Sequence, residues 1–241
     1  MLYTAFPMVV HAILPAAGLG TRMAMPGVSA KQFLSLGGVP ILIHSVRAFT
    51  DKTNVRSVTL AVRAVELDHV QTQLEQFGLA EKVKVVTGGE TRQESVAAAL
   101  RSLDAGPDDV VLVHDAVRPL IDGATIERTI EAIAKHGAAI VGVGATDTIK
   151  LVERTADGAI IMGTVPRERV VQAQTPQGAR FADLKRAFDE AEADSFAGTD
   201  EASLLERAGV TVAVVSGAAA NLKITQAGDL ELAEFYLKQR K

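Results

Sequence analysis

The chain has 241 residues, 48% of them hydrophobic and 22% charged, which is the composition of one large or two small globular domains. Glycine and proline occur 20 and 8 times, close to average usage, so a collagen-like or low-complexity chain is excluded. The formal net charge of −4 argues against a nucleic-acid-binding domain, and the lack of cysteine excludes disulfides, thiolate metal sites and a thiol nucleophile.

Apolar, β-branched runs alternate with helix-length segments through the first half of the chain. In chain order, the patterns predict a strand at 9–14, a helix at 39–49, a strand at 57–62, a helix at 65–77, a strand at 82–86, a helix at 92–103, a strand at 109–113, a helix at 123–135 and a strand at 138–143. Continuously apolar strands separated by helices are typical of βαβ units. The expected fold class is therefore α/β, with a Rossmann-like, mostly parallel and doubly wound sheet.

The alternation changes after Gly144, where runs at 146–153 and 159–165 alternate like a β-hairpin around Asp157-Gly158. The remaining elements are predicted as a strand at 170–174, helices at 181–193 and 201–207, a strand at 210–215 and a helix at 230–237. We expect a single domain at 8–241 with a β-arm inserted at 145–177. Such an arm cannot bury its apolar inner face alone, so we expect it to serve dimerisation; a lid over its own site is the alternative.

The beginning of the chain lacks the basic region and the cleavage site of a signal peptide, and we expect a start at either Met1 or Met8. No apolar run approaches about 18 residues, so no transmembrane helix and no membrane partner are expected. The lack of cysteine fits a reducing compartment. We therefore expect a cytoplasmic protein.

A glycine-containing loop follows the first predicted strand and reads Pro15-Ala16-Ala17-Gly18-Leu19-Gly20-Thr21-Arg22. In a doubly wound sheet the ligand crevice lies at the carboxyl ends of the strands. Glycines there let backbone N–H groups approach phosphates, and Arg22 adds a guanidinium fork suited to phosphate oxygens. Lys31, a few residues later, can reach back to the same groups. A Gly-rich turn without a ligand and a solvated surface lysine are the alternatives.

Three common sites do not match this loop. A dinucleotide-binding loop needs a third glycine where Met23 stands and an acidic residue where Arg63 follows the second strand. The chain has no Gly-Lys pair for a P-loop and no Gly-x-Ser-x-Gly elbow. A second polar cluster, His114, Asp115 and Arg118, ends the strand at 109–113 at the same expected edge. An Asp–Arg surface pair is the alternative for this cluster, and we expect His114 to be a packed, hydrogen-bonded histidine.

Eight ordered blocks from residue 13 to about residue 237 carry a family resemblance. They are Pro15-Ala16-Ala17-Gly18-x-Gly20-x-Arg22-Met23, Lys31-Gln32-Phe33, Gly88-Gly89-x-x-Arg92-x-x-Ser95-Val96, Val113-His114-Asp115-Ala116-x-Arg118-Pro119, Asp147-Thr148-x-Lys150, Gln174-Thr175-Pro176-Gln177, Thr199-Asp200-x-Ala202 and Asn221-x-Lys223-Ile224-Thr225. The chain resembles the cytidylyltransferases that act on sugar-alcohol phosphates, most closely those that use 2-C-methyl-D-erythritol 4-phosphate. The resemblance implies transfer of CMP from CTP to the acceptor phosphate, with release of pyrophosphate, Mg²⁺ as cofactor and a homodimer. An acceptor phosphate is already ionised, so charge stabilisation, rather than a general base, must drive the reaction.

The resemblance also implies a role for individual residues. The implied catalytic residues are Arg22, Lys31, Arg167 and Lys223. The implied nucleotide-binding residues are Pro15, Ala16, Ala17, Gly18, Gly20, Gly89, Glu90, Ser95 and Ala116. The implied acceptor-binding residues are Asp115, Arg118, Arg167, Thr175, Thr199 and Lys223. Arg167 and Thr175 would serve the partner subunit's site, and Asp115 would approach a Mg²⁺ or other divalent ion held mainly by the CTP phosphates.

Two rival functions remain open at this point. Ala30 before Lys31, the loop at 23–30, Val117 and Ala179 depart from the pattern of the erythritol-phosphate enzymes. Ribitol 5-phosphate cytidylyltransferases tolerate the longer loop and the valine, so they remain an alternative. A non-catalytic nucleotide sensor on the same fold is the second. Retention of Arg22, Lys31, Arg167 and Lys223 disfavours the sensor.

Overall fold

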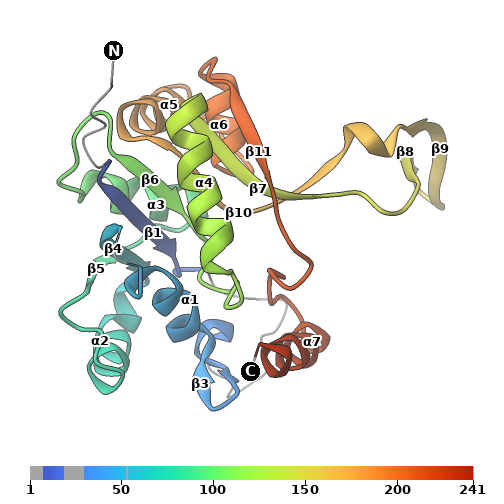
Figure 1. Ribbon diagram of the computed structural model, residues 1–241. Helices are drawn as coiled ribbons and strands as arrows, with labels where there is room; N and C mark the ends of the chain where they lie inside the picture. The colour runs from blue at the N-terminus through green and yellow to red at the C-terminus, as the bar shows by residue number, and fades with distance from the viewer. Residues whose placement is uncertain (1–7, 19–29, 53, 241) are drawn as a thin grey trace.

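A seven-stranded sheet forms the centre of the molecule (Figure 1). The computed structural model describes residues 8–18, 30–52 and 54–240. The strand order is β11-β7-β10-β6-β1-β4-β5. The strands are β1 (Val10–Pro15), β4 (Val55–Val62), β5 (Val83–Thr87), β6 (Val110–Val113), β7 (Ala138–Gly144), β10 (Val171–Arg180) and β11 (Val212–Ser216). Only β10 among these seven runs antiparallel to its neighbours, so the predicted mostly parallel sheet is confirmed.

Helices cover both faces of the sheet. Side chains of α1 (Ile41–Thr50), α2 (Leu67–Gln76) and α4 (Gly123–His136) share one buried cluster with Ala12 and Leu14 of β1. Side chains of α3 (Arg92–Arg101), α5 (Phe181–Ala193) and α6 (Glu201–Arg207) share another with the intervening Ile13. Successive strand residues point to opposite faces, and both faces of β1 are buried and, apart from His11, apolar. The expected doubly wound arrangement is confirmed.

A third, smaller cluster lies below the carboxyl edge of the sheet and joins α7 (Ala227–Gln239) to a short hairpin, β2 (Ser35–Leu36) and β3 (Val39–Pro40). The helix predicted at 39–49 therefore begins later, at Ile41. Gly37 and Gly38 have φ values of 58° and 86°, which suit a two-residue hairpin turn. Pro40 favours an extended residue before it and lacks an N–H to donate, so Val39 joins a strand instead of a helix.

The strand order creates a crevice beside β1. From β1 the chain proceeds to β4 and β5 on one side, and then returns to β6 on the other side of β1. In open α/β sheets, ligands bind at the carboxyl ends of the strands where the direction of winding reverses. The loops after β1 and β6 therefore flank the expected binding crevice.

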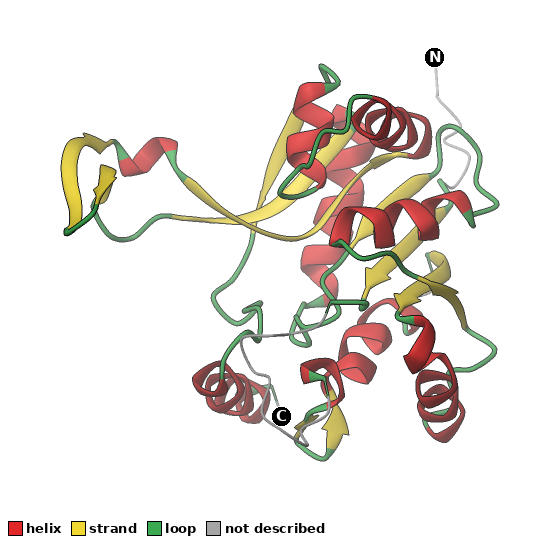
Figure 2. Cartoon of the chain, turned by 180° about the vertical axis from the view of Figure 1, so that it is seen from behind, coloured by secondary structure: helices red, strands yellow, loops and turns green. Residues whose placement is uncertain are grey.

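An arm leaves the body of the molecule after β7 (Figures 1 and 2). It consists of β8 (Ile149–Thr155) paired with β9 (Gly158–Val165), followed by a short 3-10 turn at Arg167–Arg169. The arm is shorter than the expected segment 145–177, because residues 171–177 belong to β10 and pair with β7. The strand predicted at 170–174 is thus part of β10, which continues to Arg180, and its polar residues Gln174, Thr175 and Gln177 are buried in the sheet.

The remaining differences from the predicted elements concern boundaries. Short 3-10 helices occur at Lys31–Phe33 and Ala64–Glu66, and the second shortens the helix predicted at 65–77. Within the described ranges, no helix combines the length and apolar character needed to cross a bilayer.

Candidate active site

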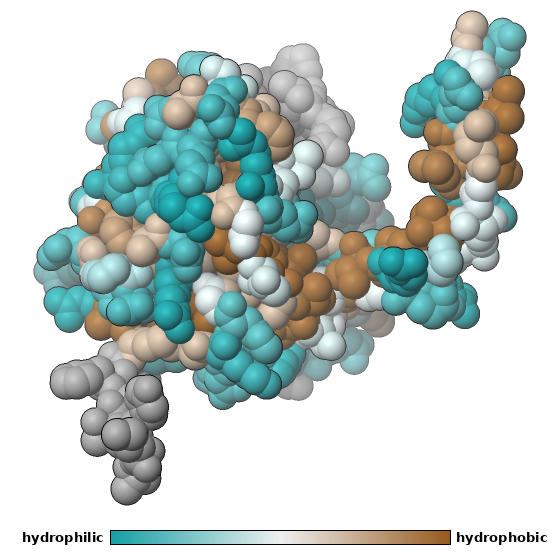
Figure 3. All heavy atoms as spheres, turned by 90° about the horizontal axis from the view of Figure 1, so that it is seen from above, coloured by the Kyte–Doolittle hydropathy of each residue, from teal (hydrophilic) through white to brown (hydrophobic). Residues whose placement is uncertain are grey.

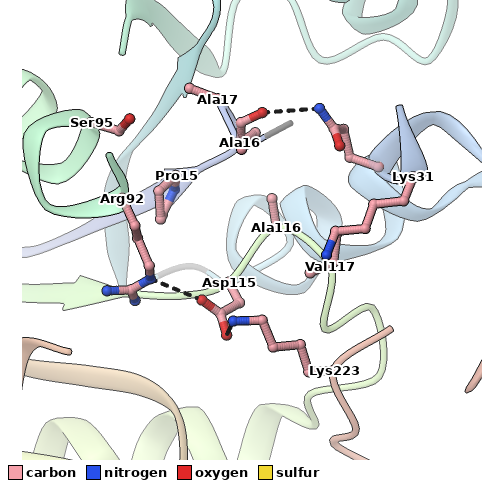
Figure 4. A pocket seen from close by; sticks show the side chains of 12 residues that line it. Pro15, Ala16, Ala17, Lys31, Arg92, Ser95, Asp115, Ala116, Val117 and Lys223 are labelled. Carbon is pink, nitrogen blue, oxygen red and sulfur yellow. Dashed lines mark hydrogen bonds and ion pairs between the residues drawn. The ribbon is translucent and has the colours of Figure 1, made fainter. Parts of the chain in front are cut away.

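A pocket of about 250 Å³ opens at the crevice predicted by the strand order (Figure 4). Its walls come from the loop after β1, the loop after β6, the first turns of α3, the 3-10 turn at Lys31–Phe33 and the segment before α7. The lining residues are Pro15, Ala16, Ala17, Gly18, Lys31, Gln32, Arg92, Ser95, Asp115, Ala116, Val117 and Lys223. Small residues after β1 and cationic side chains around the rim suit a phosphorylated ligand.

The loop after β1 is anchored at its entry. The Ala16 N–H donates to the Ala61 carbonyl at 2.7 Å, and the Gln32 side-chain amide donates to the Ala16 carbonyl at 3.0 Å. Gln32 is buried, so its neighbour Lys31 is held beside the loop and lines the pocket. In Figure 4, Lys31 and Arg92 stand on opposite sides of Asp115. Gly20 and Arg22 lie outside the described residues.

The turn between β5 and α3 packs tightly against this loop. Gly89 N–H donates to Ser95 Oγ at 3.2 Å, and Thr91 caps α3 in a reciprocal capping box with Glu94. A Cβ on Gly88 would lie 2.8 Å from Ser95 Oγ and 2.9 Å from Ala17 Cβ. Glycine at position 88 therefore allows the loop after β1 and the start of α3 to meet.

Replacing Gly88 by Ala should lower the free energy of unfolding by about 1–3 kcal/mol, because Ala17 Cβ cannot rotate away and Ser95 Oγ is held by hydrogen bonds to the Thr91 carbonyl and the Gly89 N–H. Urea denaturation of both proteins measures this difference. Gly144→Ala is the matched control, since a Cβ there would meet nothing within 4 Å. Equal stability of Gly88→Ala and the wild type would contradict the packing argument.

Asp115 is the centre of the charged part of the pocket. Its Oδ1 accepts from Arg92 Nε at 3.2 Å, and its Oδ2 accepts from Arg118 Nε at 3.1 Å and lies 3.0 Å from Lys223 Nζ. Arg92 extends further, and its two terminal nitrogens donate to both carboxylate oxygens of Glu201 at 2.7 and 2.9 Å. Three cations and two carboxylates therefore form one network, which leaves a net positive charge.

The network holds Asp115 ionised. Burial alone would raise the pKa of this carboxyl, but the charges of Arg92, Lys223 and Arg118 outweigh it and hold the pKa well below its usual range. A carboxylate offers about four acceptor positions, and three are occupied. One position on Oδ1 remains for a hydroxyl group of a ligand.

The same contacts do not suit a metal ion at Asp115. A divalent cation bound there would face three positive groups that already use the carboxylate. Among the described residues, no group of three or more His, Asp or Glu side chains could hold a metal. The contacts of Asp115 therefore do not favour a metal site built by the protein, and its approach to an ion held by CTP stays a prediction.

Behind Asp115, a chain of hydrogen bonds fixes the loop after β6. The Asp115 N–H donates to Thr175 Oγ1 at 3.0 Å, and Thr175 Oγ1 lies 3.0 Å from His114 Nδ1. His114 Nε2 lies 3.0 Å from the Arg118 carbonyl, which can only accept, so the neutral ring carries its proton on Nε2 and Nδ1 accepts from Thr175. His114 is fully buried, as expected for a packed histidine. Thr175, expected in the partner's site, is buried in β10 and supports the site of its own chain.

Stability should depend on pH through His114. Burial lowers the pKa of His114 from 6.5 to about 4, so between these values the unfolded chain binds a proton that the folded chain excludes. The free energy of unfolding should therefore fall by about 3 kcal/mol from this group as the pH drops from 6.5 to 4. Denaturation at several pH values, compared between the wild type and His114→Gln, measures the effect. An identical pH slope in both proteins would show that His114 is not responsible.

The pocket unites most of the residues expected from the sequence. Those lining it are Pro15, Ala16, Ala17, Gly18, Lys31, Ser95, Asp115, Ala116 and Lys223. Arg118 and Thr175 lie behind the wall and hold Asp115 in place, and Gly89 and Glu90 flank the turn that leads to Ser95.

Two expected residues lie elsewhere. Thr199 is exposed and precedes α6, on the far side of Arg92 from the pocket, where its N–H donates to Ser203 Oγ. Arg167 lies on the arm, where its side chain is 57% exposed and donates to the Thr146 carbonyl at 2.9 Å. Neither contributes to the pocket of this chain.

Four residues of the site receive no role from the sequence, one of which is Val117, a pocket residue at a variable position of its block. Gln32 and Arg92 lie within the resembling blocks, but nothing there distinguishes them from surface residues. Glu201 lies 109 residues from Arg92, so no spacing relates the two. Only the fold brings this pair together.

The fold and the pocket define an α/β protein with a cationic, glycine-lined crevice at the switch point of its sheet, an arrangement typical of proteins that bind phosphorylated nucleotides. The family model described as 2-C-methyl-D-erythritol 4-phosphate cytidylyltransferase matches residues 10–239. The chain belongs to this family, as the resemblance predicts.

Individual relatives agree with the family model. The chain is 61% identical to the 2-C-methyl-D-erythritol 4-phosphate cytidylyltransferase of Acidobacterium capsulatum over 234 residues, which cover 96% of this chain and 98% of that protein. It is 48% identical to the protein of the same name from Solibacter usitatus, with 96% and 97% covered. The crystal structure of the Francisella tularensis cytidylyltransferase superposes with a TM-score of 0.79 at 33% identity, covering 94% of this chain and 99% of that one.

Proposed function

We infer that this chain transfers CMP from CTP to 2-C-methyl-D-erythritol 4-phosphate, a step in the synthesis of isoprenoid precursors. An oxygen of the acceptor phosphate forms a bond to the α-phosphorus of CTP. The bond between the α-phosphorus and the bridging oxygen breaks, and pyrophosphate leaves with the electron pair. The observation that carries this proposal is the cationic pocket around Asp115 in a chain whose family is named for this reaction. The ribitol 5-phosphate enzyme and the nucleotide sensor are not favoured by these relatives.

The positions of the residues support a division of the pocket. The loop at 15–18 and the start of α3 at Ser95 provide small side chains and backbone groups for the nucleotide. Lys223, held by Asp115, is suited to the acceptor phosphate, and the remaining acceptor position of Asp115 is suited to a hydroxyl of the sugar alcohol. Lys31 lies across the pocket, where it would stabilise the charge that grows on the triphosphate. Arg22 is proposed for the same task from the resemblance.

Mg²⁺ is proposed to enter with CTP rather than to occupy a site built by protein carboxylates. It would supply charge neutralisation on the phosphate oxygens. The contacts of Asp115 support this view, because its oxygens are engaged by Arg92, Arg118 and Lys223. The residues of the chain would then bind and orient CTP and the acceptor phosphate, and Mg²⁺ would be required because the triphosphate carries it.

The direct test measures pyrophosphate release from CTP with each acceptor in turn. Turnover with 2-C-methyl-D-erythritol 4-phosphate and little with ribitol 5-phosphate is expected, and EDTA should abolish it until Mg²⁺ is restored. Preference for ribitol 5-phosphate would change the acceptor but not the chemistry. No turnover with either would contradict the proposed function.

A homodimer formed through the arm is the second part of the proposal. The arm carries large apolar side chains that a single chain leaves in water, among them Leu151, Ile160, Ile161 and Met162, each about 60% exposed. Figure 3 shows this apolar surface on the projecting arm. Burial against a second copy would remove it from water. Arg167, which lies at the base of the hairpin and away from its own pocket, would then complete the partner's site.

Mixing two inactive variants tests this sharing. Arg167→Ala and Lys31→Ala would each be impaired as homodimers, but a heterodimer would carry one site with both substitutions and one with neither. We expect activity to rise toward about a quarter of the wild-type value once the subunits have exchanged fully. Exchange is followed with differently tagged chains. No recovery after demonstrated exchange would exclude a shared site.

A further inference from the structure

Glu201, a buried carboxylate outside the pocket, fixes the orientation of the Arg92 guanidinium toward the pocket. Glu201 is 1% exposed and engages both terminal nitrogens of Arg92, at 2.7 and 2.9 Å. Arg92 therefore presents only its Nε to the pocket side, where it donates to Asp115. The guanidinium plane is fixed at both ends, as Figure 4 shows for the end that meets Asp115.

Glu201 itself is rigidly placed. It is the first residue of α6, which begins at the N-cap Asp200. The Gln177 side chain, buried in β10, donates to Asp200 Oδ2 at 2.9 Å and accepts from the Ala202 N–H at 3.0 Å. These contacts on both sides of Glu201 tie the start of α6 to the central sheet. The carboxylate thus has little freedom to follow Arg92 if the arginine were to move.

The arrangement withholds a strong phosphate-binding group. A guanidinium with free terminal nitrogens binds phosphate oxygens in a bidentate manner, more specifically than an ammonium group. Arg92 lines a pocket that receives two phosphorylated ligands in the proposed function, and its free fork would attract either of them. Pairing with Glu201 removes that option and leaves Lys223 and Lys31 to bind the phosphates.

We propose that Glu201 is a positioning residue that keeps the Arg92 fork out of the phosphate site and fixes Asp115, and through it Lys223, for the acceptor. The proposal rests on the proposed function for its kinetic consequence only. Its binding consequence concerns any phosphate anion. If Glu201 had a purely structural role, its loss would weaken both phosphate binding and catalysis. This proposal instead predicts that its loss strengthens phosphate binding and lowers kcat/KM for the acceptor.

The test combines kinetics with binding of inorganic phosphate to the full chain. In Glu201→Gln, kcat/KM for the acceptor should fall about 10- to 100-fold, as misplacement of binding groups can cause, while KM for CTP changes less than about threefold. Calorimetry should show inorganic phosphate binding about threefold to tenfold more tightly, because the two terminal nitrogens of Arg92 become free to donate to phosphate oxygens. Glu201→Asp, which keeps the charge but withdraws it by one methylene, should shift both values in the same directions by less.

Glu192→Gln is the matched control. Glu192 pairs with Arg101 of the same helix α3 through both of its oxygens, at 3.3 and 3.1 Å, on the outer surface. This variant should change neither value by more than about threefold. Unchanged or weaker phosphate binding in Glu201→Gln would overturn the proposal, as would equal losses for both substrates. If Glu201→Gln does not fold, Glu201→Asp provides the test: phosphate should bind more tightly and kcat/KM for the acceptor should fall.

The two hypotheses fail in different ways. Lack of turnover by the wild type would contradict the proposed function, and phosphate binding would still test Glu201. Normal wild-type turnover with unaltered behaviour of both Glu201 variants would contradict the positioning role alone.

Discussion

Replacing Asp115 by Asn should lower the free energy of unfolding at pH 7 by about 3–5 kcal/mol, the usual cost of removing one partner from a buried ion pair. The carboxylate is 6% exposed and balances Lys223 and Arg118, which would face each other without it. Arg92 would retain its ion pair with Glu201. Urea or thermal denaturation gives the difference.

The deficit should depend on pH with a definite sign. The pKa of Asp115 is held below the ordinary value of 3.8, so its contribution is complete above that value and is lost as the pH falls toward the folded-state pKa. The two proteins should therefore converge in acid. Asp108→Asn is the control, because Asp108 is 84% exposed in its pair with Arg180 and should change stability by less than about 0.5 kcal/mol. Equal stability of wild type and Asp115→Asn at pH 7 would show that the network is not stabilising.

The amino-acid pattern predicts most of the sheet because a buried strand forms a short, continuous apolar run in the sequence. Apolar runs give β1, β4, β6 and β7 within about two residues, and the helices at 181–193 and 201–207 match α5 and α6. The pattern fails at β10, which continues through polar residues to Arg180.

The failure at β10 has a physical cause. Gln174, Thr175 and Gln177 are buried only because distant groups satisfy them: the Ala218 carbonyl, His114 and Asp200. A sequence does not show such partners, so a polar strand in a sheet resembles a loop. The same limit explains the arm, because the expected segment 145–177 includes residues of β10 that lie in the central sheet.

The candidate site divides in the same way. Motif positions beside strand ends, such as Gly18, Asp115 and Ala116, are predictable because parallel strands bring their carboxyl ends to one edge. The supporting contacts are not, since Arg92 and Glu201 meet across 109 residues. The motifs therefore predict most of the residues that line the pocket, and the fold decides which groups hold them.

Lys31 provides the largest expected effect on turnover. Lys31→Ala should lower kcat by about 10²–10³-fold, the cost of losing one preorganised group that stabilises developing charge. Lys31 is the first residue of a 3-10 turn that is fixed by the Gln32 contact to Ala16. Its ammonium group therefore needs little reorganisation to face a triphosphate. Steady-state kinetics with CTP and the acceptor measures the effect. A loss mainly in kcat would indicate stabilisation of the transition state, whereas a rise in KM for CTP alone would indicate ground-state binding.

Stability and a second lysine separate this effect from general damage. Lys31 is half-buried at the rim, so the thermal midpoint of Lys31→Ala should stay within a few degrees of the wild type. Lys52→Ala removes an ammonium that pairs with Glu127 at 2.7 Å on α4, away from the pocket residues, and should leave kcat unchanged. Turnover of Lys31→Ala within threefold of the wild type would remove Lys31 from the catalytic residues, and the charge that grows on the leaving pyrophosphate would then have to be stabilised by Lys223 and Arg22.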